Sequence, residues 1–185
     1  MEKKIDFEKL QSGDTKIKYA LAKELLQTSE VSPVELYPFF GNFITLLDDS
    51  NNIIKWTAID IIGNLAVVDQ DKKIDQEVMD KLYDLLQDDK LITCNHAIYA
   101  SGMIAQHRPE YKPEIIKRLL LVPDNNFETD ECEAIVIGKV LEALTPFIKE
   151  IKNEKEVRLF VKAATDSPRN STKRKATELL NKIGK

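Results

Sequence analysis

The sequence predicts an all-α protein built from a repeated pair of helices, and three observations lead to this prediction. Apolar residues recur at helical spacing in nine segments, and no segment shows a convincing alternation of apolar and polar residues. The chain has only six glycines and seven prolines, and they separate the apolar segments. Residues 53–66, IIKWTAIDIIGNLA, return with the same spacing as ITCNHAIYASGMIA at residues 92–105. The chain therefore contains nearly the same helix twice.

Five helices, the first helices of the repeated pairs and the final helix, are expected at residues 15–28, 52–68, 91–107, 130–144 and 170–183. Three of them follow acidic or Asn/Ser-rich clusters, namely DDSNN before Ile53, DD at 88–89 and DNNFETDE at 124–131. Short polar side chains of this kind cap helices and complement their dipoles. The run IVIGKVL is rich in β-branched residues, but it lies inside ECEAIVIGKVLEAL, whose length favours a helix.

Four second helices, expected at residues 38–48, 74–88, 113–121 and 154–166, alternate with the first helices. Pro38, Pro113 and Pro168 stand where a first helical turn begins, a position that tolerates the missing N–H of proline. Pro146 marks the end of the helix before it. The proline positions therefore agree with the boundaries that the apolar spacing predicts.

The helix around the first copy of the repeat is apolar over most of its circumference. Ile54 and Ala58 fall in one narrow stripe, whereas Trp56 lies on the other side. A helix of this kind must be covered from several directions, as an inner helix of a repeat would be. Gly63 and Gly102 each cost about 1 kcal/mol relative to alanine inside a helix, so we expect a neighbouring helix or large side chain to approach closely there.

Helix pairs repeat every 36–42 residues, and this period is typical of an α-solenoid. The repeat extends to ECEAIVIGKVLEAL and to TKRKATELLNKIGK near the end of the chain. We expect a single domain over residues 1–185, with units at 14–49, 50–89, 90–127 and 128–167 and a C-terminal capping helix at 168–185. The segment IDFEKL near the start is the candidate cap at the other end.

The pattern resembles the HEAT-repeat family. The shared features are an acid-rich turn, a mid-helix alanine, an Ile/Leu pair and a small residue one turn later, as in DSNNIIKWTAIDIIGNLA, DDKLITCNHAIYASGMIA and DSPRNSTKRKATELLNKIG. The resemblance covers residues 14–185 and implies a right-handed α-solenoid of about four and a half HEAT-like helix pairs, whose second helices line a concave protein-binding surface. The fourth unit departs from the family pattern, because Glu133 replaces the expected alanine and TPFIKEIKN forms a long connector. The pairing of its helices stays open.

Charge and composition restrict the classes of partner. The net charge is −4, but the residues from Pro168 onward have a net charge of +5 and the preceding 167 residues a net charge of −9. An acidic body argues against binding to a phosphate backbone, since that affinity comes largely from clustered Lys and Arg. No run approaches the ~18 apolar residues of a membrane helix, and two cysteines form no disulfide framework. We expect a cytoplasmic protein that does not bind a membrane.

No set of residues points to catalysis, a metal or a cofactor. Cys94, His96 and Cys132 come nearest to a zinc site, but residues i and i+2 of a helix point about 200° apart. The acidic runs lack the glycine turn and final glutamate of an EF-hand, and phosphate-binding glycine loops are absent. Related helical-repeat enzymes include alkylpurine DNA glycosylases and phycobilin lyases. A glycosylase needs a basic, aromatic groove, whereas the one tryptophan lies on a largely buried helix, and no motif specific to the lyases is present.

The predicted function is a non-enzymatic protein-interaction module, a scaffold or adaptor that binds a peptide or helix on its concave surface. The candidate binding residues lie on the second helices, outside the apolar stripe, and they form a ridge that passes from acidic to basic. They are Asp80, Lys81, Tyr83, Asp84, Lys117, Arg118, Arg158 and Lys162. Two alternatives stay open: a nucleic-acid-binding or DNA-glycosylase-like repeat protein, and a homo-oligomer formed through the end repeats. We expect a monomer or a weak homo-oligomer.

Overall fold

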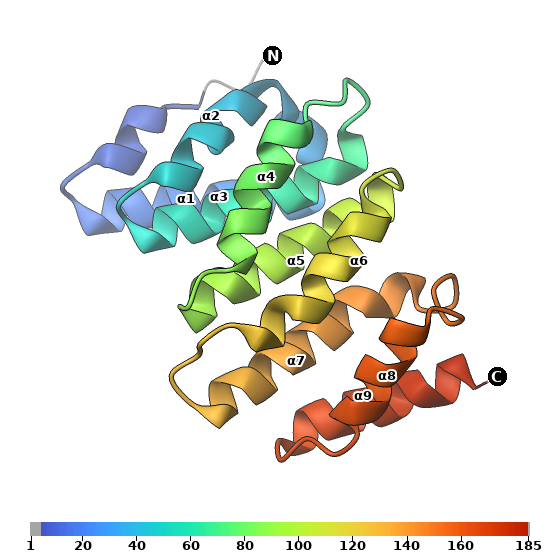
Figure 1. Cartoon of the computed structure of the whole chain (residues 1–185). Helices are drawn as coiled ribbons and strands as arrows, with labels where there is room; N and C mark the ends of the chain where they lie inside the picture. Colours follow the sequence, from blue (N-terminus) through green and yellow to red (C-terminus); the bar gives the residue numbers. More distant parts are fainter. Residues whose placement is uncertain (1–4, 185) are drawn as a thin grey trace. The chain divides into compact units, whose positions relative to one another are not determined.

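The computed structural model of the chain describes residues 5–184, and the regular structure over these residues is entirely helical (Figure 1). The α-helices are α1 (Thr15–Val31), α2 (Phe40–Thr45), α3 (Asn52–Leu65), α4 (Gln76–Leu86), α5 (Leu91–His107), α6 (Lys112–Leu121), α7 (Asp130–Leu144), α8 (Lys155–Ala164) and α9 (Asn170–Ile183). Short 3-10 helices accompany them: η1 (Phe7–Gln11), η2 (Pro33–Glu35), η3 (Tyr37–Phe39), η4 (Leu46–Asp48), η5 (Ala66–Val68), η6 (Val122–Asp124) and η7 (Thr145–Phe147). The all-α prediction is confirmed. Residues 1–4 and 185, at the ends of the expected domain, lie outside the described residues.

Side-chain caps start two of the long helices where the polar clusters predict them. At α3, the side chain of Asn51 accepts hydrogen bonds from the backbone N–H groups of Ile53 and Ile54, at 3.0 and 3.3 Å. At α7, the hydroxyl of Thr129 accepts a bond from the N–H of Cys132 at 3.2 Å. The first turn of a helix has no internal partners for its N–H groups, so these caps supply them.

The helix expected at 38–48 is shorter than the apolar spacing predicts. Only α2 is α-helical, and the tighter η3 and η4 flank it. Pro38 lies inside η3, before the α-helix begins. At the other end, the hydroxyl of Thr45 donates to the carbonyl of Asn42 at 2.8 Å. A side-chain bond of this kind competes with the backbone and accompanies the change from α to 3-10 geometry.

The chain divides into two compact units, Met1–Lys81 and Leu82–Lys185. In the first unit α1 and α2 both pack against α3, and η1 covers α1. Leu10 of η1 is buried, and the ring of Phe7 lies 5.6 Å from the ring of Phe43 in an edge-to-face arrangement. The IDFEKL segment therefore covers the apolar side of the first helix pair.

In the second unit the first helices of successive repeats lie side by side in chain order, α5 against α7 and α7 against α9. Figure 1 shows α6 and α8 in front of these three helices as a second layer. Helix α6 packs on α5 and α7. Fully buried apolar side chains fill the unit: Ile98, Ile104, Ile115, Leu119, Val140, Leu141, Val157 and Val161. Stacked two-helix repeats therefore share one continuous core within this unit.

The fourth helix pair, which the sequence leaves open, has an unusual arrangement. Helix α8 makes its main contacts with α9 and α6. The connector between α7 and α8 buries Phe147, Ile148 and Ile151. Through these apolar side chains the long connector contributes to the core of the unit, although it is not a regular α-helix.

Two repeat glycines allow neighbouring first helices to approach closely. A Cβ atom on Gly102 of α5 would lie 2.9 Å from Cβ and 3.2 Å from Cα of Ala143 on α7. A Cβ atom on Gly138 of α7 would lie 2.7 Å from the hydroxyl oxygen of Thr172 on α9. Contacts this short force a neighbouring atom to shift, so alanine fits neither position without a rearrangement of α7 or of the Thr172 side chain. The prediction of a close approach is confirmed at Gly102.

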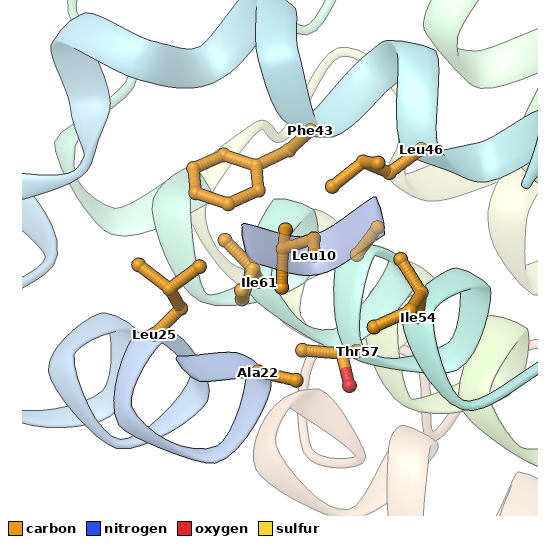
Figure 2. A pocket seen from close by; sticks show the side chains of 9 residues that line it. Leu10, Ala22, Leu25, Phe43, Leu46, Ile54, Thr57 and Ile61 are labelled. Atoms are coloured by element: carbon orange, nitrogen blue, oxygen red, sulfur yellow. The ribbon is translucent and has the colours of Figure 1, made fainter. Parts of the chain in front are cut away.

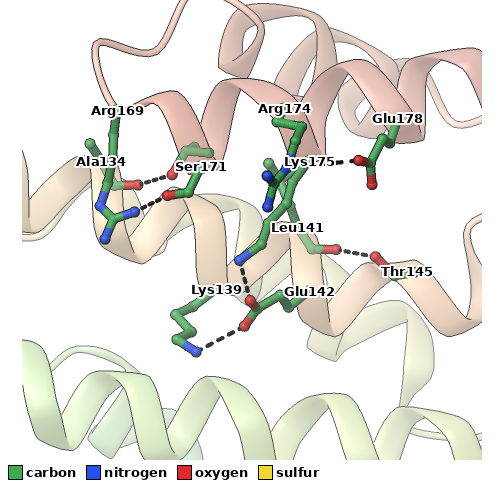
Figure 3. Close-up of polar contacts among 11 residues, drawn as sticks. Ala134, Lys139, Leu141, Glu142, Thr145, Arg169, Ser171, Arg174, Lys175 and Glu178 are labelled. Atoms are coloured by element: carbon green, nitrogen blue, oxygen red, sulfur yellow. Dashed lines mark hydrogen bonds and ion pairs between the residues drawn. The ribbon is translucent and has the colours of Figure 1, made fainter.

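Polar contacts also join α7 to α9 (Figure 3). The hydroxyl of the buried Thr172 donates to the carbonyl oxygen of Ala134 at 2.7 Å. Arg169 Nε lies 2.9 Å from Glu131 Oε1. Glu142 accepts hydrogen bonds from Lys139 and Lys175. The hydroxyl of Thr172 thus fills the space that the missing side chain of Gly138 leaves, and it satisfies a carbonyl of α7 at the same time.

Candidate functional site

Helices α6 and α8 expose two stripes with the same spacing. On α6 the buried residues are Ile115, Ile116 and Leu119, and on α8 they are Val157, Val161 and Ala164. The opposite stripes are wholly or partly exposed and consist of Glu114, Lys117, Arg118 and Leu121 on α6, and of Lys155, Arg158, Leu159 and Lys162 on α8. Positions i, i+3, i+4 and i+7 lie on one face of a helix. Because α6 and α8 pack against each other, we call these eight residues the α6–α8 surface.

Within α6 the single acidic residue of the stripe pairs with two basic residues. Arg118 Nε lies 2.7 Å from Glu114 Oε1, and Lys117 Nζ lies 3.9 Å from Glu114 Oε2. The guanidinium of Arg118 also lies over the ring of Tyr83, 4.8 Å from its centroid. Arg118 is therefore fixed in place by two partners, whereas Lys117 extends into solvent.

The prediction that Tyr83 points outward is wrong. Its exposed fraction is 4 %. Met79, one turn earlier on α4, is also buried. The buried stripe of α4 is therefore wider than the single row of residues that the sequence indicates, and Tyr83 belongs to it. Its ring nevertheless supports the surface, because Arg118 rests on it.

Two basic residues of α8, Arg158 and Lys162, make fewer polar contacts within the chain than Arg118 of α6 does. Arg158 makes one long hydrogen bond, from Nη1 to the carbonyl oxygen of Lys152 at 3.5 Å. Neither Arg158 nor Lys162 has a carboxylate within ion-pair distance among residues 5–184. Both side chains are exposed. These two cations are therefore available to an external anion.

Two leucines join the cations on this surface. Leu121 has an exposed fraction of 52 % and Leu159 of 56 %. The sequence interpretation missed both, because it assigns leucine in a helix to the core by default. Their register is the signal that was available, since each leucine falls on the charged stripe of its helix.

On α4, three predicted residues have different surroundings. Lys81 Nζ lies 2.8 Å from Asp48 Oδ2, and this hydrogen bond raises the pKa of Lys81. Asp80 accepts a hydrogen bond from Gln76 at 2.7 Å. Asp84 is exposed. Asp80 and Lys81 belong to the first unit and Asp84 to the second, so the predicted residues that the structure brings together are those of α6 and α8.

The charge of the second helices differs between α4 and the two later helices. Helix α4 has three acidic residues and one basic residue, whereas α6 and α8 each have three basic residues and one acidic residue. The whole second unit contains 17 basic and 16 acidic residues. Helices α6 and α8 are therefore more basic than the unit as a whole, and so is α9, which has four basic residues and one acidic residue.

The two cysteines that were considered as metal ligands lie in unlike surroundings. Cys94 is fully buried, with Sγ 3.5 Å from the carbonyl oxygen of Leu86. Burial, assisted by the negative charge of Asp88, raises the pKa of its thiol to about 12. Cys132 is partly exposed and accepts a hydrogen bond from the hydroxyl of Thr129. In the part of the chain that the structure describes, no group of three or more His, Cys, Asp or Glu side chains is arranged to hold a metal ion.

A small apolar cavity lies in the first unit (Figure 2). Its volume is about 10 Å³. Its lining consists of core residues, namely Leu10, Ala22, Leu25, Phe43, Leu46, Ile54, Thr57, Ala58 and Ile61. A ligand pocket is much larger, about 300–1,000 Å³. The cavity is therefore a packing gap beneath η1. None of the described helices is long and apolar enough to cross a membrane.

Comparison with known proteins identifies the fold. No protein-family model matches the chain, and no curated protein matches it. A designed armadillo repeat protein is similar in structure, with 18 % sequence identity, a TM-score of 0.53 and coverage of 95 % of this chain and 97 % of that one. The fold is an α-solenoid. An engineered protein has a TM-score of 0.53 at 14 % identity, with coverage of 95 % and 96 %. A designed armadillo repeat protein in complex with the peptide (KR)4 has a TM-score of 0.52 at 20 % identity, with coverage of 95 % and 87 %.

Proposed function

We propose that this α-solenoid is a non-enzymatic protein-interaction module that binds a peptide or helix along the exposed stripes of its second helices. The observation that carries the proposal is the α6–α8 surface, where free cations and exposed leucines occupy the exposed stripes of two helices that contact each other. Apolar side chains flanked by charges are typical of surfaces that recognise peptides. The repeats are proposed to be of the HEAT type, within one domain, and the protein is proposed to be cytoplasmic.

A second line of support is the comparison with a designed repeat protein of the same fold in complex with a peptide. A shared fold does not transfer a function, because binding depends on the residues of the site. It does support the expectation that a solenoid of this length can present an extended surface to a peptide. The residues of the α6–α8 surface supply the chemistry.

The nucleic-acid alternative fits the same surface less well. Binding of single strands relies on aromatic side chains that stack on bases. Tyr83, the aromatic residue beneath Arg118, is buried. Exposed leucines add little to phosphate binding but contribute directly to contacts with protein side chains.

The proposal is tested by selecting peptides from a displayed library against the full chain. Each enriched peptide is then measured with a variant that carries Leu121→Ser and Leu159→Ser. A matched control carries Val31→Ser and Val34→Ser, which replace two exposed apolar residues of the first unit. We expect the α6–α8 variant to weaken binding at least about tenfold, or 1.4 kcal/mol, while the control binds as the unmodified chain does. Failure to enrich any peptide, or loss of binding only in the control, contradicts the proposal.

A further inference from the structure

We propose that the partner of the α6–α8 surface is an acidic protein segment that carries apolar side chains between its carboxylates. This inference rests on the proposed function and adds the chemistry of the partner. It follows from which charges on the surface are already paired within the chain, which are not, and what lies between them.

The cations of the surface outnumber its acids. Glu114 is the single acid among the eight residues, and it is engaged by Arg118 at 2.7 Å and Lys117 at 3.9 Å. Glu156, the one acid of α8, lies outside the stripe. The surface therefore presents positive charge that no acid of the described chain neutralises.

The unpaired cations of the surface lie on α8. Lys155, Arg158 and Lys162 are exposed, and none of them has a carboxylate within ion-pair distance among the described residues. Their spacing places them on successive turns of one helix face. An arginine binds a carboxylate through two parallel hydrogen bonds, and a lysine adds a mobile point charge. A row of this kind matches a segment with repeated Asp or Glu residues.

The exposed leucines favour a partner that carries apolar side chains as well as negative charge. Leu121 and Leu159 each leave more than half of their surface in water. A partner with apolar side chains would cover them and remove their apolar surface from water, which favours binding. A nucleic acid or a run of acids alone leaves them exposed. The combination of cations and leucines therefore favours an acidic segment with interspersed apolar residues.

The charge of the preferred peptide is expected to differ from that of the peptide in the structural relative. That designed protein is in complex with (KR)4, a basic peptide. On the α6–α8 surface, a basic peptide would meet like charges, which are repulsive and reduce the rate of association. The α-solenoid fold is shared, but the surface charge predicts the opposite selectivity.

The test uses three fluorescent dodecapeptides with leucine at the same positions, measured by anisotropy with the full chain. Their repeating sequences are Glu-Glu-Leu-Glu, Gln-Gln-Leu-Gln and Lys-Lys-Leu-Lys. We expect the acidic peptide to bind at least about tenfold more tightly than the neutral one, with an affinity that falls as salt is added. The basic peptide is expected to bind most weakly.

Charge reversal locates the binding. The double variant Arg158→Glu and Lys162→Glu is expected to bind the acidic peptide at least about tenfold more weakly than the unmodified chain does. It is expected to bind the basic peptide more tightly than the acidic one. The control is Lys173→Glu and Arg174→Glu, the same change of charge at exposed residues of α9, and it should leave the affinity within about threefold. Circular dichroism and urea unfolding establish that both variants are folded.

Each outcome separates this inference from the proposed function. If the neutral or basic peptide binds best and depends on Leu121 and Leu159, the surface binds peptides but the acidic partner is wrong. If none of the three peptides binds while library peptides still do, the acidic partner is also wrong. If neither set binds, both proposals fail. A thymidine oligonucleotide that binds more tightly than the acidic peptide, through Arg158 and Lys162, overturns the inference in favour of nucleic acid.

Discussion

The two cysteines illustrate how the surroundings of a single residue control its chemistry. Cys94 has no exposed surface, and burial raises the pKa of its thiol to about 12, so the reactive thiolate is scarce at neutral pH. Cys132 lies in the first turn of α7 and is partly exposed. The same side chain is therefore inert at one position and accessible at the other.

Alkylation at pH 8 is expected to modify Cys132 alone in the folded chain. Cys94 should react at least about a hundredfold more slowly, because it is both buried and protonated. Mass spectrometry of digested protein after timed exposure to iodoacetamide measures both rates. The cysteine account is wrong if both residues are labelled at similar rates before urea unfolds the chain.

The phenol of Tyr37 is expected to ionise at a higher pH than a free tyrosine, because it lies in a polar cluster of the first unit. The hydroxyl donates to Asp69 Oδ1 at 2.7 Å. Burial, together with this bond and the charge of Asp69, raises the pKa of Tyr37 from 10.0 to about 12. The folded state favours the neutral phenol, so the associated stability is complete below about pH 10 and is lost as the pH rises towards 12. Absorbance at alkaline pH measures this ionisation, with Tyr37→Phe as the reference. A difference titration centred near 10 rather than 12 would contradict the assignment.

At the scale of helices, boundaries were predicted best for three of the first helices, of which only α7 begins with a side-chain cap. The ends of α5, α7 and α9 agree with the predicted ranges 91–107, 130–144 and 170–183. Helix α2 was predicted too long, because apolar spacing does not distinguish an α-helix from adjoining 3-10 turns. The outward direction of Tyr83 was also missed, since the width of a buried stripe depends on the neighbouring helices and not on its own sequence.

The close packing of first helices predicts that Gly102→Ala and Gly138→Ala are destabilising. Alanine has the higher helix propensity by about 1 kcal/mol, but the new methyl group meets Ala143 or Thr172 at less than 3 Å. We expect a net loss of about 1–3 kcal/mol in the free energy of unfolding, measured with urea. Gly41→Ala is the matched control, because nothing lies within 4 Å of its added Cβ. If all three variants are equally stable, the close approach is not present in solution.

The ionic contact between α7 and α9 predicts a modest pH dependence. Burial alone would raise the pKa of Glu142, but hydrogen bonds from Lys175 and Lys139 outweigh it and lower the pKa below 4.5. The associated stability is present above pH 4.5 and is lost as the pH falls through the lowered pKa. Glu142→Gln should cost less than about 1 kcal/mol at pH 7, because the side chain is 43 % exposed. Urea unfolding over a pH series should show the cost shrinking in acid; a constant cost would refute the ionic origin.

At the scale of the whole molecule, the repeat period in the sequence predicted the fold class, and the structural similarity to a designed armadillo repeat protein supports it. The candidate site was predicted in part. Lys117, Arg118, Arg158 and Lys162 were found because charged residues outside an apolar stripe face solvent. The exposed leucines were not found, since solvent exposure of an apolar residue depends on which helices cover it.

The two compact units of the chain differ in net charge. The first unit contains 10 basic and 15 acidic residues, for a net charge of −5, while the second has a net charge of +1. The proposed acidic partner is therefore repelled by the net charge of the first unit but not by that of the second. The homo-oligomer alternative predicts a mass that rises with protein concentration, and light scattering measures it.

The most direct test of the central claim is an NMR map of peptide binding on the isotope-labelled full chain. The acidic leucine-containing dodecapeptide is added stepwise, and the backbone amide signals are followed. We expect the largest shifts at residues 114–121 of α6 and 155–162 of α8, with little change on α1 and α9. Shifts concentrated on any other helix, or no shifts at a saturating concentration of peptide, would contradict the account.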